Sequence, residues 1–254
     1  TKLNGVRISD TYFAPGWTSY KNHLQYQVYD VTALLRVGSN ALGASLGNGW
    51  YKGRIGFGNQ HNFYGDTRGL LLQLEVEYTD GTRETINTDE NWKYTYGPIM
   101  ASDIYDGEIY DARMEITGWD NIDFKEDSNW KNVNVMNKGT EKLIAMSGPP
   151  VRKHEQFKAL SIFKTPKGET VVDFGQNLVG WVMLKAQGPT GTKITLSHAE
   201  VLTKEGNFYT TNLRSAKAQD SYILKGGAEQ IFEPHFTFQG FRYVKVEGYP
   251  RELK

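Results

Sequence analysis

The chain has 254 residues, which is enough for one large β domain or two of ordinary size. Its 29 basic and 29 acidic residues give a formal net charge of +0, a balance that favours neither a nucleic-acid partner nor an anionic membrane surface. No apolar run approaches the roughly 18 residues of a membrane-spanning helix. With 0 Cys, disulfide and thiolate chemistry are excluded. A hydrophobic share of 39% indicates a globular protein.

Strand signals dominate the chain, and helical periodicity is nearly absent. A short helix is predicted at residues 31–35, after Asp30 as a candidate N-cap. Residues 70–78 and 83–86 flank Asp80-Gly81, which predicts a β-hairpin. Further strands are predicted at residues 41–46, 171–174, 179–186, 193–199, 221–224 and 241–246. Short strands separated by Gly- and Asn-rich turns favour β-sandwiches over βαβ units, so the predicted fold class is all-β.

A domain boundary is indicated between Trp130 and Pro150. Residues 137–142 are polar, and the Ser-Gly-Pro-Pro sequence at 147–150 cannot continue a strand. We therefore expect two consecutive β-sandwich domains, at residues 1–145 and 146–254.

Several short motifs of the first predicted domain occur in a characteristic order. They are Leu3-Asn4-Gly5, Tyr29-Asp30-Val31-Thr32, Gly47-Asn48-Gly49-Trp50-Tyr51, Gly53-Arg54-Ile55-Gly56-Phe57 and Tyr64-Gly65-Asp66. On physical grounds alone they are scaffold, since Asn-Gly forms a tight turn. Together they resemble the jelly-roll, galactose-binding-like N-terminal accessory domain of bacterial α-L-rhamnosidases, glycoside hydrolase family 78.

The stretch 102–113 has the densest group of potentially functional side chains in the sequence. It carries four carboxylates in nine positions: Asp103, Asp106, Glu108 and Asp111. On a strand, Asp106 and Glu108 share one face and the other two share the opposite face, unless Gly107 forms a bulge. Like charges on one strand face repel, so they call for a cation, an arginine or bound hydroxyl groups.

Three interpretations of this acidic stretch stay open. It is a solvated edge strand with Arg113 as its counter-ion, or a catalytic acid–base pair, for which no organising third group is evident. Alternatively, it is a site for sugar hydroxyl groups or Ca²⁺, because hard oxygens suit both ligands.

The family resemblance bears on these alternatives. In the family, the accessory sandwich is similar to a carbohydrate-binding module that holds L-rhamnose through a calcium ion. The resemblance implies Asp106 and Glu108 as sugar-binding residues and as the calcium ligands, with no other cofactor. It extends the sugar site to Asn48, Asn62 and Asp111. Trp50 either offers an aromatic face to a sugar ring or packs in the core.

The second predicted domain contains motifs that resemble the concanavalin-like sandwich of the same enzymes. They are Asp173-Phe174-Gly175-Gln176-Asn177, His198-Ala199-Glu200, Asn212-Leu213-Arg214 and Gly240-Phe241-Arg242-Tyr243. We interpret Gly175-Gln176-Asn177 as a turn between two strands. His198 and Glu200, two residues apart, would face the same way on a strand and could bind a metal, although no third ligand is evident.

The resemblance covers nearly the whole chain and implies a division of labour in the parent protein. Hydrolysis of terminal α-L-rhamnosyl residues, with inversion, is attributed in the family to a downstream (α/α)₆ barrel. The sequence contains none of the helical repeats that such a barrel requires, so we expect the fragment to be inactive. It also looks as though it starts inside a domain, so the missing signal peptide is uninformative. The expected localisation is periplasmic, extracellular or cytoplasmic in a bacterium, with export favoured.

Two functions compete at this stage, and a third possibility is that the sandwiches shape the rim of the full enzyme's active site from outside. In the first, the N-terminal domain binds rhamnose-containing oligosaccharides or polysaccharides near the catalytic barrel. In the second, both sandwiches are spacers that brace the barrel and bind no ligand. An exposed aromatic residue beside the carboxylates favours the first function, whereas burial of Trp50 and ion pairing of Asp106 and Glu108 favour the second.

Overall fold

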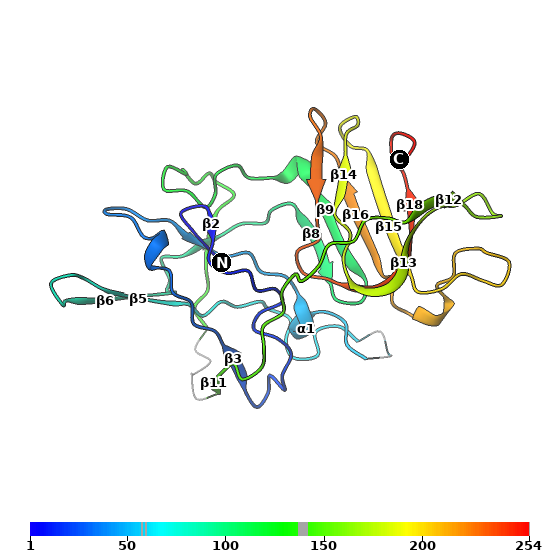
Figure 1. Ribbon diagram of the computed structural model, residues 1–254. Helices are drawn as coiled ribbons and strands as arrows, with labels where there is room; N and C mark the ends of the chain where they lie inside the picture. The colour runs from blue at the N-terminus through cyan, green and yellow to red at the C-terminus, as the bar shows by residue number, and fades with distance from the viewer. Residues whose placement is uncertain (57, 59, 137–141, 254) are drawn as a thin grey trace.

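The computed structural model describes residues 1–56, 58, 60–136 and 142–253 (Figure 1). Within these residues, regular helix is limited to α1 (Gly49–Lys52) and the 3₁₀ turns η1 (Thr32–Leu34), η2 (Ala112–Met114) and η3 (Thr211–Leu213). The all-β prediction is therefore confirmed. None of the described helices has the length and apolar character needed to cross a membrane.

The N-terminal part, on the left of Figure 1, consists of small sheets with short strands. A three-stranded sheet has the order β2 (Val6–Arg7), β1 (Lys2–Leu3), β4 (Leu42–Gly43). Two-stranded sheets pair β3 (Leu24–Tyr26) with β11 (Leu143–Ala145), β5 (Gln73–Glu77) with β6 (Arg83–Asn87), and β7 (Lys93–Tyr94) with β10 (Lys131–Asn132). The β5–β6 hairpin projects away from the rest of the molecule.

The C-terminal part is a sandwich built on a seven-stranded sheet. Its order is β12 (Ser161–Lys164), β13 (Thr170–Gly180), β18 (Gln239–Glu247), β15 (Lys193–Ala199), β16 (Gln219–Ile223), β9 (Gly107–Asp111) and β8 (Ile99–Asp103). A second, two-stranded sheet pairs β14 (Leu184–Ala186) with β17 (Gln230–Phe232).

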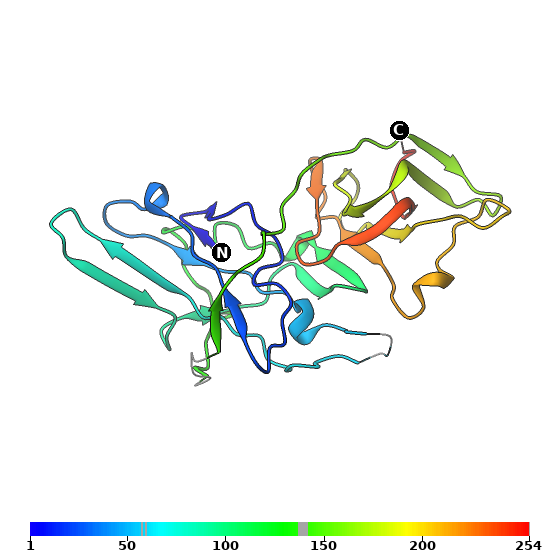
Figure 2. The same cartoon turned by 60° about the horizontal axis from the view of Figure 1, so that its bottom comes forward.

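Strands from before and after the predicted boundary share this large sheet. The β8–β9 hairpin joins it through a parallel pairing of β9 with β16, in which Tyr110 lies opposite Tyr222. Figure 2 shows the two parts of the molecule side by side, with β8 and β9 at their junction. The division at residues 145 and 146 stays a prediction, and the sheet crosses it.

The hydrophobic core lies mainly in the C-terminal sandwich. Among the described residues, the buried hydrophobic side chains before residue 156 are Leu3, Ile104 and Ala112. The main cluster comprises Ala112, Leu184, Ala186, Ile194, Leu196, Tyr222, Leu224, Phe232, Phe241, Val244 and Val246. Ala112 directly follows β9, so the β8–β9 hairpin is anchored in the core of the C-terminal sandwich.

Several local predictions are confirmed. Asn4 and Gly5 form the turn between β1 and β2, with φ of 53° and 80°, as a tight Asn-Gly hairpin turn requires. Strands β5 and β6 form the predicted hairpin around Asp80-Gly81. The helix predicted at 31–35 is the 3₁₀ turn η1; its N-cap is Val31 and not the predicted Asp30, although Oδ1 of Asp30 accepts a hydrogen bond from the Thr32 N–H.

Other local predictions are wrong, for reasons of tertiary pairing. Residues 170–180 form one strand, β13, and the expected turn at 175–177 is a bulge at which the pairing with β18 shifts register. Residues 102–113 are a hairpin, not one strand, because Asp103 ends β8 and Gly107 begins β9. The strand expected at 41–46 is reduced to β4.

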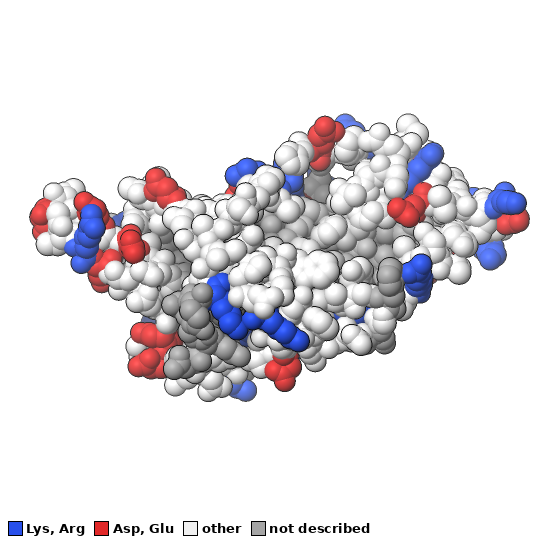
Figure 3. All heavy atoms as spheres, turned by 90° about the horizontal axis from the view of Figure 1, so that it is seen from below, with Lys and Arg blue, Asp and Glu red and all other residues white. Residues whose placement is uncertain are grey.

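Charged side chains of both signs are spread over the face shown in Figure 3, and neither sign covers it. This distribution agrees with the formal net charge of +0. It gives the face no basic surface of the kind that binds nucleic acid.

Candidate functional site

The acidic hairpin lies where the two parts of the molecule meet. Asp103 organises its turn, because its Oδ1 accepts hydrogen bonds from the N–H groups of Tyr105 (2.9 Å) and Asp106 (3.0 Å). Gly107 has φ of +104°, a conformation that favours glycine. The turn therefore places Asp106 and Glu108 in different surroundings and does not put them on one strand face.

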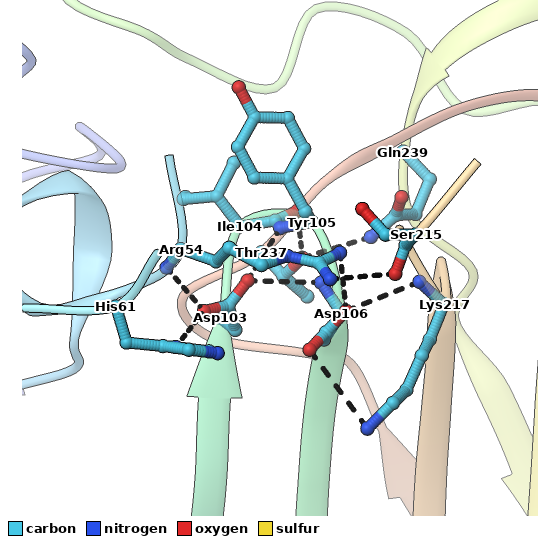
Figure 4. A network of polar contacts seen from close by, with 10 residues as sticks. All are labelled: Arg54, His61, Asp103, Ile104, Tyr105, Asp106, Ser215, Lys217, Thr237 and Gln239. Carbon is cyan, nitrogen blue, oxygen red and sulfur yellow. Dashed lines mark hydrogen bonds and ion pairs between the residues drawn. The ribbon is translucent and has the colours of Figure 1, made fainter. Parts of the chain in front are cut away.

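Arg54 joins this hairpin to both neighbouring segments (Figure 4). Its side chain is 3% exposed, and its Nη2 lies 2.7 Å from Oδ1 of Asp106. Its Nη1 donates a 2.6 Å hydrogen bond to the Ser215 carbonyl oxygen, and its backbone N–H donates to Oδ2 of Asp103. One buried guanidinium thus connects the segment after α1, the hairpin turn and the loop before β16.

The loop before β16 holds Asp106 from a second direction. The Lys217 N–H donates a 3.2 Å hydrogen bond to Oδ1 of Asp106, and its Nζ lies 4.0 Å from Oδ2. On the other side of the turn, Oγ1 of Thr237 donates to the Ile104 carbonyl oxygen at 3.1 Å. Asp106 is therefore ion-paired within the protein.

Glu108 is fully buried, with 0% exposure. Its Oε2 accepts hydrogen bonds from the backbone N–H groups of His235 (2.9 Å) and Phe236 (3.1 Å). Its Oε1 lies 2.8 Å from Nδ1 of His235, and because an ionised carboxylate only accepts, Nδ1 donates. Glu108 thus fixes the loop before β18 and is closed to outside ligands.

The remaining predicted site residues are each held locally. Oδ1 and Oδ2 of Asp111 accept hydrogen bonds from the Arg113 guanidinium, which holds the pKa of Asp111 below its usual value. Oδ1 of Asn48 accepts a 2.9 Å hydrogen bond from Arg68. Asn62 is exposed, and its backbone N–H donates to the Lys52 carbonyl oxygen.

Trp50 lies on α1 and is partly buried. Among the described residues, its ring contacts are to Phe13, in an edge-to-face arrangement, and to Trp17, whose ring is parallel to within 4° at 6.5 Å between centroids. Trp17 is 52% exposed. The structure thus pairs Trp50 with aromatic rings and with none of the carboxylates.

His198 and Glu200, considered above as metal ligands, do not share a face. His198 is 0% exposed in β15, whereas Glu200 follows the end of that strand and is exposed. Nδ2 of Asn177 donates a 3.2 Å hydrogen bond to Oε1 of Glu200. Strand β15 ends at Ala199, between the two residues. The alternation of side chains between the two strand faces therefore does not extend to Glu200.

Comparison with known proteins identifies the family. The profile of the α-L-rhamnosidase N-terminal domain matches residues 1–155, and that of the bacterial α-L-rhamnosidase concanavalin-like domain matches residues 163–254. The chain belongs to the α-L-rhamnosidase family. Its two matched regions are the domain types that the sequence motifs predicted.

Relatives agree with this assignment over nearly the whole chain. An α-L-rhamnosidase of Streptomyces avermitilis is 47% identical over 98% of the chain, and one of Formosa agariphila is 37% identical over 97%. The crystal structure of native α-L-rhamnosidase from Aspergillus terreus superposes with a TM-score of 0.96 at 44% identity, covering 100% of this chain and 29% of that one. That of the S. avermitilis enzyme complexed with L-rhamnose gives 0.94 at 46% identity, over 99% of this chain and 24% of the other. The chain spans 24% and 27% of the two curated relatives, about a quarter of their length.

The predicted calcium ligands of this rhamnosidase segment do not fit a calcium ion as they stand. Calcium requires six to eight oxygen ligands, mostly carboxylates and carbonyls free to coordinate. The oxygens of Glu108 accept hydrogen bonds from His235 and Phe236, and Asp106 contacts two cationic side chains. Across the described residues, no group of three or more His, Cys, Asp or Glu side chains is arranged to hold a metal ion.

Local sequence patterns point only weakly to the residues that organise this hairpin. Arg54 lies in the Gly53-Arg54-Ile55-Gly56 motif and His235 in Glu233-Pro234-His235-Phe236, and neither local pattern indicates a partner. Arg54 and Ser215 are 161 residues apart in sequence, so no local pattern reports their contact.

Replacement of Glu108 by glutamine should destabilise the chain by about 1–3 kcal/mol, because the fully buried side chain loses its hydrogen bond with the partly exposed His235 ring. Urea unfolding followed by tryptophan fluorescence measures this. The matched control is Glu229→Gln at an exposed position, which should change stability by less than about 0.5 kcal/mol. Equal stabilities of both variants would show that Glu108 does not hold the loop before β18 in place.

Proposed function

We propose that this chain is the non-catalytic β-sandwich portion of an α-L-rhamnosidase that hydrolyses terminal α-L-rhamnosyl residues, and that its acidic hairpin is a structural joint. The joint locks the N-terminal part onto the C-terminal sandwich, so that both form a firm support for a catalytic domain. The matched family regions support the parent activity, and the contacts of the hairpin support the structural role.

One observation carries the structural role: the predicted ligand carboxylates have protein partners. Asp106 contacts Arg54 and Lys217, and Glu108 contacts the His235 loop. A sugar hydroxyl or a cation would have to displace a buried guanidinium or buried backbone N–H groups, leaving them without partners. The alternative of a calcium-dependent rhamnose site is therefore the weaker proposal.

Titration calorimetry of the chain with L-rhamnose, with and without Ca²⁺, tests this function. We expect no binding heat in either condition, and no release of aryl alcohol from an aryl α-L-rhamnoside. Heat that requires calcium and disappears in Asp106→Asn would establish the sugar site instead. Protein-dependent turnover of the aryl rhamnoside would overturn the non-catalytic assignment.

A second candidate function rests on the Trp17–Trp50 pair. The two rings are parallel, and Trp17 is half exposed, with its Nε1 donating a 3.2 Å hydrogen bond to the Tyr64 hydroxyl. An exposed, fixed indole suits stacking against the apolar face of a sugar ring. In the same titration, heat that is independent of calcium and lost in Trp17→Ala would favour this function over the structural one.

A further inference from the structure

Two buried polar atoms face each other in the C-terminal sandwich, beside strand β9 of the acidic hairpin. Nε2 of His198, on β15, lies 4.0 Å from Oδ2 of Asp220, on β16, and the side chains are 0% and 1% exposed. Within the described part of the chain, these are the buried side-chain N and O atoms without a hydrogen-bond partner. A buried polar atom without a partner costs free energy, so this pair requires a physical explanation.

The hydrogen bonds around the pair fix its chemistry. Nδ1 of His198 lies 2.9 Å from the Ala218 carbonyl oxygen, and since a carbonyl only accepts, Nδ1 carries the hydrogen and donates it. In a neutral His198, Nε2 is therefore a bare acceptor. Oδ1 of Asp220 accepts a 2.9 Å hydrogen bond from the Glu108 N–H, which leaves Oδ2 facing Nε2. If Asp220 is ionised, two acceptors oppose each other in the core.

We propose that the His198–Asp220 pair binds one proton, carried on Oδ2 of Asp220 and directed at Nε2 of His198. This arrangement turns two opposed acceptors into a donor and an acceptor and leaves no net charge on the pair. The 4.0 Å separation exceeds a hydrogen bond by about 1 Å, which a small rotation of the carboxyl group closes. The pair contacts the acidic hairpin through the Glu108 N–H, but the proposal does not depend on the structural role proposed for that hairpin.

The surroundings favour the neutral form. Burial raises the pKa of Asp220 to about 7; the hydrogen bond from the Glu108 N–H lowers it and the Glu108 charge raises it, both by less than burial does. Burial lowers the pKa of His198 to about 4. From β18, His198 meets uncharged side chains, with the Phe241 ring at 4.9 Å and Val244 opposite in the strand pairing. The Glu108 side chain is itself held in position by His235.

Folding then moves a proton from one residue to the other. The ordinary pKa values are 3.8 for Asp220 and 6.5 for His198. Between about pH 4 and 6.5, the unfolded chain carries one proton on the histidine, and the folded chain carries one on the aspartate. Asp220 alone would lose stability as the pH rises through this window, and His198 alone would gain it. The two opposite pH dependences cancel. The pair therefore contributes no net pH dependence to the free energy of unfolding in this pH window.

Replacement of Asp220 by asparagine should remove this cancellation and make the stability depend on pH. The amide keeps an acceptor for the Glu108 N–H and offers an N–H donor to Nε2, so the fold is retained. Only His198, with its lowered pKa, then exchanges protons on folding. Relative to the wild type, the unfolding equilibrium constant of Asp220→Asn should increase by up to about tenfold per pH unit as the pH falls from 6 to 4.5. Urea unfolding across this range measures it.

The control is Asp123→Asn, at an exposed position, whose unfolding should follow the wild type at each pH. A slope in Asp220→Asn equal to that of the wild type would overturn the proposal. The second measurement needs no variant: ¹⁵N NMR of the wild-type chain should show His198 as the neutral Nδ1–H tautomer from pH 5 to 8. A His198 imidazolium at pH 6 would overturn the proposal even if Asp220→Asn failed to fold.

Discussion

Replacement of Arg54 by methionine is expected to lower the free energy of unfolding by about 3–5 kcal/mol, the range for removing one partner of a buried ion pair. Methionine preserves much of the packing of the arginine stem but leaves Asp106 without its guanidinium. It also leaves the Ser215 carbonyl oxygen without its donor. Because Arg54 connects three segments, the loss should weaken the junction between the two parts. Urea unfolding and limited proteolysis at the junction measure both effects.

The matched control for this variant is Arg83→Met. Arg83 also pairs with a carboxylate, that of Glu77, but the two side chains are 77% and 62% exposed. Exposed pairs of this kind contribute about 0.2–1 kcal/mol. If Arg54→Met cost no more than Arg83→Met, the acidic hairpin would not be a structural joint.

Replacement of Gly107 by alanine should destabilise the chain by about 2–4 kcal/mol, from backbone strain together with a steric clash. Gly107 has φ of +104°, and a Cβ placed there would lie 2.1 Å from the Gln219 carbonyl oxygen. Gln219 begins β16, so the clash would push β9 away from the strand that holds it in the sheet. Chemical unfolding gives the size of the effect.

Gly81→Ala is the control that separates strain from collision. Gly81 has φ of +84° in the turn between β5 and β6, and a Cβ there would meet nothing within 4 Å. It should cost about 1–2 kcal/mol, the price of the left-handed conformation alone. A Gly107→Ala variant no less stable than Gly81→Ala would show that β9 and β16 are free to separate.

Both variants concern the same architectural feature, the insertion of β8 and β9 into the large sheet. The hairpin reaches the core through Ala112 and meets β16 through backbone pairing. Its charged turn faces Arg54 and the loop before β16. The two family regions therefore share a sheet and the hydrogen bonds from Arg54 to Ser215 and from Lys217 to Asp106, which makes their junction part of the fold and not a flexible linker.

The sequence by itself determined the all-β class, the Asn4-Gly5 turn and the β5–β6 hairpin. These features depend on contacts between near neighbours, so residue type and spacing report them directly. The ordered motifs also determined the family, since several multi-residue matches in sequence cannot arise from composition alone. The sequence also showed that the carboxylates of residues 102–113 need partners, because like charges so close together repel in any fold.

Only the tertiary structure decided what those partners are. The hairpin turn at residues 104–106 separates Asp106 from Glu108, and each then meets residues more than 50 positions away, Arg54 for the first and His235 for the second. The bulge in β13 and the His198–Asp220 pair are likewise set by strand register. Burial and long-range pairing depend on the whole fold, and the free energy of a charged group depends on both. The same carboxylates that suggest a calcium site in sequence therefore have protein partners in the folded chain, Arg54 for Asp106 and His235 for Glu108.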